Sequence, residues 1–180
     1  MQQEKDLVEA ARRGNGDAFS QLYEDYFDRV YRYIIFRVGS QEEAEDITEE
    51  VFLKVWQNIA SFKWRGVPFS SWLFRIAHNQ VVDHLRKRER RKGVPLDEVS
   101  LADDVDLDAS LDFQLSVEKL VAAMGRLTDA QRRTLALRFA AGLSLSETAQ
   151  AMGKSEGAIK ALQHSALAAL RRVMSAEAGG

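Results

Sequence analysis

Apolar residues recur at intervals of three and four along most of this 180-residue chain. That interval places side chains on one face of an α-helix, whereas a half-buried strand needs strict alternation. Only two prolines occur, Pro68 and Pro95, and signals for tight turns are few. With 46% hydrophobic residues, the chain has enough apolar side chains for packed cores. We therefore expect an all-α fold.

Residues 17–92 are expected to form about four helices, because their apolar stripes have helical spacing. Ser40, followed three residues later by Glu43, predicts a capping box that opens one of these helices. After a turn at 63–68, a long helix runs into the basic tail RKRERRK. The stripe of the first helix is Phe19, Leu22, Tyr23, Tyr26, Val30, Tyr33 and Ile34. That of the long helix is Leu73, Ala77, Val81 and Leu85.

Residues 142–172 predict two helices joined by a tight turn. Ser144 and Glu147 form a second capping-box pattern, and Gly153 stands where a left-handed C-terminal cap is needed. Ser155 can then cap a longer helix. This pattern is typical of a helix-turn-helix, in which the second helix enters the major groove of DNA. The alternative is a plain helical hairpin with a solvated outer face.

Charged residues are grouped along the chain, although the formal net charge is only -2. Residues 42–50 are acidic, residues 86–92 are strongly basic, and the segment after them is rich in aspartate. That acidic segment has too little apolar surface in any one period to fold independently. We therefore predict two small helical domains, 1–92 and 113–180, joined by a flexible acidic linker, 93–112.

The long helix also carries a polar stripe opposite its apolar one. Its members, spaced by fours, are Asn79, Asp83, Lys87 and Arg91. Aromatic residues crowd the preceding turn, namely Phe62, Trp64, Phe69, Trp72 and Phe74. Aromatic surface beside cations suits unstacked bases, which predicts a site for single-stranded nucleic acid. The alternative is that the aromatics belong to the core, and of the five we expect Trp64 to be the most exposed.

Composition and spacing argue against several other classes of protein. The absence of cysteine excludes disulfides and thiol catalysis, and removes the usual ligands of a zinc site. His78, His84 and His164 do not have a metal-ligand spacing, and no phosphate loop or nucleophile elbow occurs. We therefore expect a protein that is not an enzyme and has no cofactor. No segment approaches the ~20 apolar residues that span a bilayer, and the N-terminus lacks a signal-peptide core, so a cytoplasmic location is expected.

The order of several motifs is informative. They are "DAFSQLYEDYFDRVYRYI", "AEDITEEVFLKVW", "FSSWLFRIAHNQVVDHLRKRERR" and "LTDAQRRTLALRFAAGLSLSETAQAMGKSEGAIKALQHSALAALRR". From about Asp17 to Val173 the chain resembles bacterial extracytoplasmic-function (group 4) sigma factors of the sigma-70 family. The resemblance implies a factor that binds core RNA polymerase, recognises the minus-thirty-five and minus-ten promoter elements, and promotes DNA opening for transcription initiation. It also implies a separate anti-sigma factor as partner. The residue patterns by themselves leave open a helix-turn-helix repressor or activator that binds duplex DNA as a dimer.

The resemblance further implies roles for individual residues. Those implied in binding core polymerase are Asp46, Glu49, Glu50, Phe52, Leu53 and Trp56. Those implied in binding the minus-ten element are Lys63, Trp64, Arg65, Arg75, Asn79, Asp83, Arg86, Lys87 and Arg90. Those implied in binding the minus-thirty-five element are Lys154, Ser155, Glu156, Gly157, Lys160, Gln163, His164 and Arg171.

Overall fold

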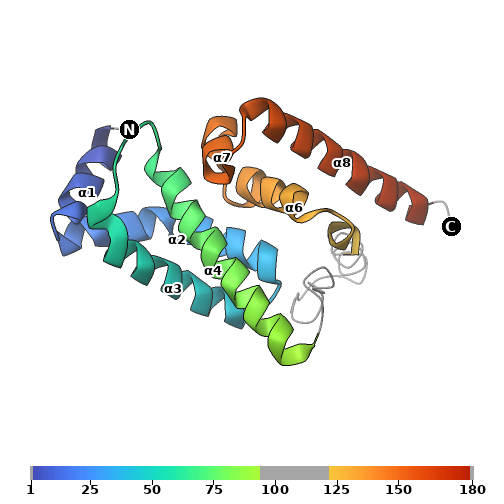
Figure 1. The fold of residues 1–180 in the computed structure, drawn as a ribbon, viewed down its shortest axis with the longest axis horizontal. Helices are drawn as coiled ribbons and strands as arrows, with labels where there is room; N and C mark the ends of the chain where they lie inside the picture. Colours follow the sequence, from blue (N-terminus) through green and yellow to red (C-terminus); the bar gives the residue numbers. More distant parts are fainter. Residues whose placement is uncertain (1, 94–121, 179–180) are drawn as a thin grey trace.

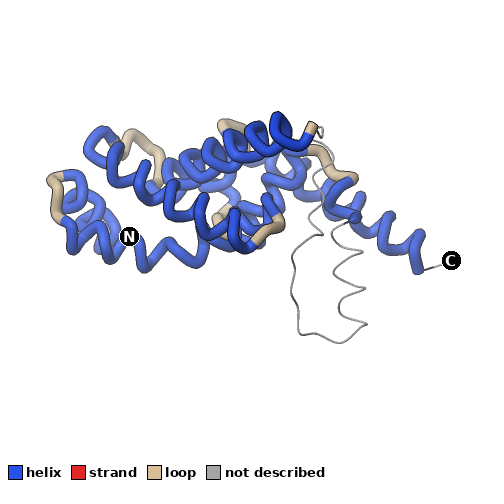
Figure 2. The backbone as a smooth tube through the Cα atoms, turned by 90° about the horizontal axis from the view of Figure 1, so that it is seen from below, coloured by secondary structure: helices blue, strands red, loops and turns tan. Residues whose placement is uncertain are grey.

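The structure is a computed structural model that describes residues 2–93 and 122–178 (Figure 1). All regular secondary structure in these two ranges is helical, which confirms the all-α prediction (Figure 2). The elements are α1 (Gln2–Arg12), α2 (Gly16–Val38), α3 (Gln41–Asn58), the 3-10 turn η1 (Ile59–Ser61), α4 (Phe69–Lys92), α6 (Asp129–Leu135), the π-helical turn η3 (Ala136–Ala140), α7 (Leu145–Met152) and α8 (Glu156–Ala178). Of the expected linker, Gly93 ends α4 with a left-handed φ of 64°, and the rest lies outside the described residues.

Helices α2, α3 and α4 enclose the core of the N-terminal half. The predicted stripe of α4 is fully inward, with Leu73, Ala77, Val81 and Leu85 buried. In α2 the stripe is mostly buried, while Phe19 and Tyr23 at its edge are only partly covered. Residues 17–92 thus contain three α-helices and one short 3-10 turn, where about four helices were expected.

Helix α1 was missed by the sequence prediction. Val8 and Ala11 on its inner face are buried, and the helix packs against α2. Leu7, Val8 and Ala11 do have the spacing of one helical face, but the stripe covers only two turns. The chain then reverses at Asn15, whose side chain accepts a hydrogen bond from the Ala18 N–H at 3.0 Å and so caps α2.

The helix-turn-helix forms where its capping signals predict it. Ser144 and Glu147 make both hydrogen bonds of the capping box at the start of α7, and Gly153 ends that helix with a φ of 63°. Ser155 Oγ accepts a hydrogen bond from the Ala158 N–H at 3.1 Å at the start of α8. Upstream, α6 begins with a further capping box and continues directly into the π-helical turn η3.

The two helical halves are in contact and share one hydrophobic core. Helix α7 lies beside α4, and η3 lies against α2 (Figure 1). Leu137 and Leu143 of the C-terminal half are buried in the same apolar cluster as the side chains of α2, α3 and α4. Burial of apolar surface stabilises by roughly 25 cal/mol per Å². The stability of each half therefore depends on the other.

We predict that Leu137→Ala will destabilise the N-terminal half as well as its own. All three tryptophans, Trp56, Trp64 and Trp72, lie in the N-terminal half, so their fluorescence reports unfolding there. Truncating a buried leucine costs about 2–5 kcal/mol, and the tryptophan transition in urea should shift accordingly. Leu53→Ala is the control, because Leu53 is 57% exposed and its loss should cost at most about 0.5 kcal/mol. An unchanged tryptophan transition in Leu137→Ala would show that the halves unfold independently.

Candidate nucleic-acid interface

The polar stripe of α4 lies on the surface, as its spacing predicts. Asn79, Asp83, Lys87 and Arg91 are all exposed, and Arg86 and Arg90 beside them are exposed as well. Because the opposite face of the helix is buried in the core, this stripe is held at a fixed rotation about the helix axis. Cations at this end also complement the negative end of the helix dipole. The result is a rigid row of hydrogen-bonding and cationic groups.

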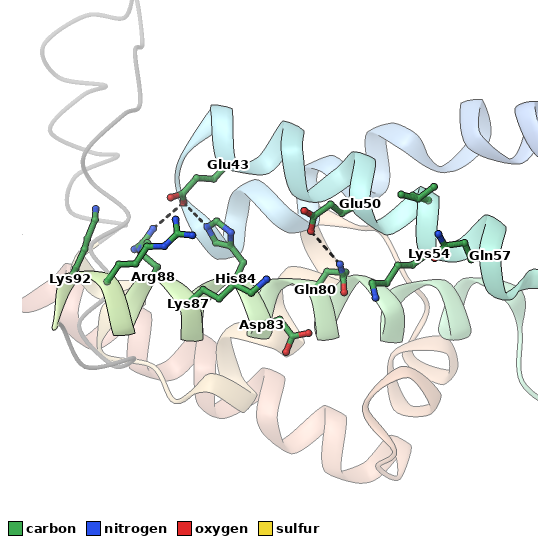
Figure 3. A pocket seen from close by; sticks show the side chains of 12 residues that line it. Glu43, Glu50, Lys54, Gln57, Gln80, Asp83, His84, Lys87, Arg88 and Lys92 are labelled. Atoms are coloured by element: carbon green, nitrogen blue, oxygen red, sulfur yellow. Dashed lines mark hydrogen bonds and ion pairs between the residues drawn. The ribbon is translucent and has the colours of Figure 1, made fainter.

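A groove of about 570 Å³ runs between α3 and α4 (Figure 3). Glu50, Leu53 and Lys54 line it from α3, and Asp83 and Lys87 line it from α4. Glu50 accepts a hydrogen bond from the Gln80 amide at 3.3 Å, which ties the two walls together. Residues expected to bind polymerase and residues expected to bind DNA therefore line a single groove.

Glu43 also lines this groove and joins its two walls. Its Oε2 accepts a hydrogen bond from Arg88 at 3.1 Å and lies 3.2 Å from His84 Nε2 (Figure 3). The Glu43 N–H donates to Ser40 Oγ at 3.4 Å, so the serine half of the predicted capping box is present. The carboxylate, which was expected to complete that box, instead joins α3 to α4.

The outer face of α3 combines carboxylates with exposed apolar groups. Asp46, Glu49 and Glu50 are exposed, and Leu53 and Trp56 are 57% and 40% exposed. Large apolar side chains on a surface commonly mark a site where another protein docks. Phe52 does not belong to this face: it is 5% exposed, and its ring lies 4.6 Å from that of Tyr23. The expectation that Phe52 contacts polymerase is thus corrected, because its side chain points into the core.

The aromatic residues around the turn divide into two groups. Phe62, Phe69 and Phe74 are buried, so the core alternative is right for them and base stacking is excluded. Trp64 and Trp72 are partly buried. Trp64, which was expected to be the most exposed of the five, is thus less covered than the three phenylalanines, and its indole Nε1–H donates to Glu9 of α1 at 3.0 Å. Lys63 and Arg65 on either side of it are exposed.

The residues expected to contact duplex DNA lie just before α8 and along it, most of them near its start. Most of them are exposed, namely Lys154, Ser155, Glu156, Gly157, Lys160, His164 and Arg171. Gln163 is the exception: it is partly buried, and its Oε1 accepts a hydrogen bond from Arg138 Nε at 3.1 Å. Arg138 also donates to the Leu143 carbonyl, so Gln163 is held against the loop before α7.

Three arginines of α2 bind the C-terminal half. Arg29 Nε donates to the Ala141 carbonyl at 2.8 Å, and Arg32 Nε donates to the Ala140 carbonyl at 3.1 Å. Arg37 forms a salt bridge of 2.8 Å with Asp129 of α6. Sequence reasoning found none of these contacts, since each partner lies about ninety residues or more further along the chain.

The first turns of α4 bind α7. Ser70 Oγ donates to Glu147 Oε1 at 2.6 Å, and Ser71 Oγ donates to the Glu147 carbonyl at 2.9 Å. Arg75 Nε donates to the Gln150 carbonyl at 3.1 Å. Arg75 was expected to contact the minus-ten element, but in this arrangement its guanidinium is engaged by the helix-turn-helix.

Two titratable groups at this contact have altered pKa values. Burial, together with the charges of Arg133 and Arg37, lowers the pKa of His78 to about 4, although the carboxylate of Asp129 opposes the change. For Glu147, burial acts to raise the pKa, but hydrogen bonds from Ser70 and Ser144 outweigh it and lower the pKa overall. His78 is therefore neutral and Glu147 charged at neutral pH.

Neither a metal site nor a membrane-spanning helix is found in the described part of the chain. Within residues 2–93 and 122–178, no group of three or more His, Asp or Glu side chains is arranged to hold a metal ion. No helix in those ranges is long and apolar enough to cross a membrane.

Together these features define a class of protein: an all-helical DNA-binding protein that joins a helix-turn-helix to a second cationic helix beside an acidic and apolar docking face. Comparison with known proteins identifies the family. Residues 22–91 match Sigma-70 region 2, and residues 123–172 match Sigma-70, region 4. The chain belongs to the ECF RNA polymerase sigma factors of the sigma-70 family, which are non-enzymatic factors for transcription initiation. This assignment decides against the dimeric repressor alternative.

Individual relatives agree with this assignment. The chain is 43% identical over 175 residues to the ECF RNA polymerase sigma factor BldN of Streptomyces coelicolor, a match that covers 96% of this chain and 66% of BldN. It is 32% identical over 164 residues to SigX of Bacillus subtilis, covering 88% of this chain and 84% of SigX. The fold is similar to that of the sigma factor RpoE in complex with the anti-sigma factor NepR from Bartonella quintana, with a TM-score of 0.68 and 24% identity over 87% of this chain and 96% of that one.

The low pKa of His78 predicts a specific pH dependence of stability. In the unfolded chain the imidazole has a pKa of about 6.5, so it binds a proton more readily than in the folded state. Stability should therefore be lost as the pH falls from about 6.5 towards 4, by on the order of 1 kcal/mol between pH 7 and pH 5. His78→Gln should have a flatter profile in urea denaturation at the two pH values. His164→Gln, on the exposed face of α8, is the control and should keep the profile of the unsubstituted protein; an equally steep profile in His78→Gln would contradict the assignment.

Proposed function

We propose that this sigma factor binds core polymerase through α3, opens the minus-ten element with α4 and loop 63–68, and holds the minus-thirty-five element as duplex with the start of α8. The observation that carries this proposal is the groove between α3 and α4. Leu53 of the docking face and Lys87 of the polar stripe line the same groove, so polymerase binding and strand opening take place side by side. Residues 1–92 and 113–180 act as the two functional domains, and 93–112 joins them.

The stripe on α4 has suitable chemistry for an unpaired strand. The amide of Asn79 both donates and accepts hydrogen bonds, and the carboxylate of Asp83 accepts them from amino groups on base edges. Arg86, Lys87 and Arg90 pair with phosphates. Taking a base out of the stack costs a few kcal/mol, which these contacts offset once the strand is open.

The start of α8 is suited to duplex DNA. Ser155 and Lys160 can bind phosphates or base edges, and Glu156 can accept a hydrogen bond from the amino group of cytosine. The helix dipole adds positive potential at this end, where α8 approaches the duplex. Gln163, held by Arg138, supports the helix rather than reaching the bases.

Binding both elements requires the two halves to separate. Positions minus ten and minus thirty-five are 25 base pairs apart, or about 85 Å along the duplex at roughly 3.4 Å per pair. A compact unit of this chain length has a radius of gyration of only about 16 Å. We therefore propose that the contacts of α7 with α4, and of η3 with α2, break when polymerase and promoter are bound. Arg75 is then released for the minus-ten element.

We further propose that an anti-sigma protein regulates this factor. The similar protein RpoE was solved in complex with the anti-sigma factor NepR. A partner that stabilises the contact between the halves would keep Arg75 away from DNA, and it would do so without covering the stripe itself.

The assignment of α3 and α4 predicts two separable defects. With core polymerase and genomic DNA fragments, the unsubstituted protein should give discrete transcript starts. Leu53→Ala should weaken core binding about fivefold or more, because it removes an exposed apolar anchor. Lys87→Ala should leave core binding unchanged and reduce open-complex formation, measured by permanganate reactivity. If both substitutions reduced both quantities equally, the division of roles would be wrong.

The assignment of α8 predicts that Lys160→Ala will weaken binding to a duplex fragment that carries the upstream element of a promoter mapped in this way. Loss of one phosphate contact should lower affinity across sequences and reduce the slope of affinity against salt by about one ion. Lys54→Ala is the matched control, since Lys54 is exposed on α3. An unchanged salt slope in Lys160→Ala would remove this residue from the interface.

A further inference from the structure

Helix α1 lies outside the residues that match Sigma-70 region 2, which begin at residue 22. It nevertheless contacts the turn η1 immediately before loop 63–68, as well as α2. Val8 and Ala11 bury its inner face, and Leu7 and Ala10 pack against the same core. The helix is therefore firmly placed, and its polar edge faces the loop that the proposed function assigns to the minus-ten element.

Two side chains of that edge contact Trp64, and a third contacts one of the two. Glu9 Oε1 accepts a hydrogen bond from the Trp64 indole N–H at 3.0 Å, and Lys5 Nζ lies 5.8 Å from the centre of the indole ring. Arg12 donates to both oxygens of Glu9, at 2.7 and 3.0 Å, and so fixes the carboxylate. The other side of the indole is set by Phe62, whose ring lies 5.0 Å away in an edge-to-face arrangement. The indole is thus oriented from two directions.

The loop needs such an anchor because its own backbone hydrogen bonds do little to fix its conformation. Residues 63–68 have no regular secondary structure, and Gly66 adopts a positive φ of 70°. If a loop becomes ordered only on binding, the conformational entropy it loses weakens the affinity. A loop that is already held in place does not have this cost. The hydrogen bond from Arg12 lowers the pKa of Glu9, so the carboxylate is ionised at neutral pH and accepts strongly.

The charges around the anchor favour nucleic acid. Lys5, Arg12 and Arg13 come from α1 and its end, and exposed Lys63 and Arg65 flank Trp64 in the loop. Glu9 is already paired with Arg12, so the remaining cations are available to phosphates. The same patch has no obvious use in a helix that served only to cover the core.

We propose that α1 is a positioning element for promoter opening, in which Glu9, fixed by Arg12, holds the Trp64 indole so that loop 63–68 is preformed for the unpaired minus-ten strand. This inference rests on the proposed role of the loop. It makes Glu9 and Lys5 functional residues of a helix that lies outside the matched region. Glu9 acts through Trp64 and does not itself touch DNA.

The test uses the full chain bound to core polymerase and a promoter mapped by the transcription assay above. Glu9→Ala should reduce open-complex formation about threefold to tenfold, the effect expected when one ordinary, partly exposed hydrogen bond is lost. Glu9→Gln should restore most of it, because the amide oxygen can accept the same indole hydrogen. Asp6→Ala is the matched control, since Asp6 is an exposed carboxylate on the same helix. Core binding should be unchanged in all three, and Glu9→Gln should open the promoter better than Glu9→Ala at a temperature where both variants are fully folded.

A spectroscopic readout separates positioning from general stability. In a background with Trp56→Phe and Trp72→Phe, Trp64 is the only tryptophan. Glu9→Ala should then make its fluorescence more accessible to acrylamide, and Glu9→Gln should reverse the change. Unchanged quenching, or unchanged or faster opening, in Glu9→Ala would overturn the proposal. If the unsubstituted protein itself opened no promoter, or Lys87→Ala had no effect, the assignment of α4 would fail instead.

Discussion

Helix α4 is packed on two sides and exposed on a third, and the rest of the structure depends on this division. Leu73, Ala77 and Val81 enter the core, while Ser70 and Ser71 face α7. A rotation of the helix that buried its polar stripe would expose these apolar side chains, at about 1.5–3 kcal/mol for each large one. The position of the groups proposed to contact DNA is therefore set by packing and not by the groups themselves. For the same reason the stripe is already in place before any strand arrives.

The contact between the two halves combines polar bonds with a small apolar patch. Arg29, Arg32 and Arg75 all donate to backbone carbonyls near the ends of η3 and α7. Water can take over both sides of such bonds, so they stabilise closure by only about 0.5–3 kcal/mol each. Water cannot replace the apolar contacts of Leu137 and Leu143 in this way, so exposing these side chains opposes separation more strongly. The interface is thus specific in geometry, and the proposed separation requires polymerase and promoter to supply contacts that replace both kinds of interaction.

Local signals in the sequence predicted much of this fold. They did not predict contacts between residues that lie far apart in the chain. Ser144, Glu147 and Gly153 act within one helix, so their capping pattern predicted both ends of α7. The stripe from Asn79 to Arg91 was likewise predictable because one helix fixes its spacing. The hydrogen bond from Trp64 to Glu9 was not predictable in this way, since the two residues lie 55 positions apart. Phe52 was wrongly expected to contact polymerase, because a residue-by-residue resemblance does not distinguish an exposed docking side chain from a neighbouring one that is buried in the core.

Glu147 shows how one local motif can serve both arrangements of the chain. Its Oε2 accepts from the Ser144 N–H at 2.7 Å and completes the cap of α7, while its Oε1 accepts from Ser70 of α4. In the proposed separation of the halves, the bond to Ser70 would be lost and the cap would remain, because Ser144 lies in the same helix-turn-helix. Water can replace Ser70 at the freed oxygen. The cap of α7 therefore does not depend on the contact between the halves, so the residue that joins them in this structure would also preserve the helix-turn-helix in the proposed open arrangement.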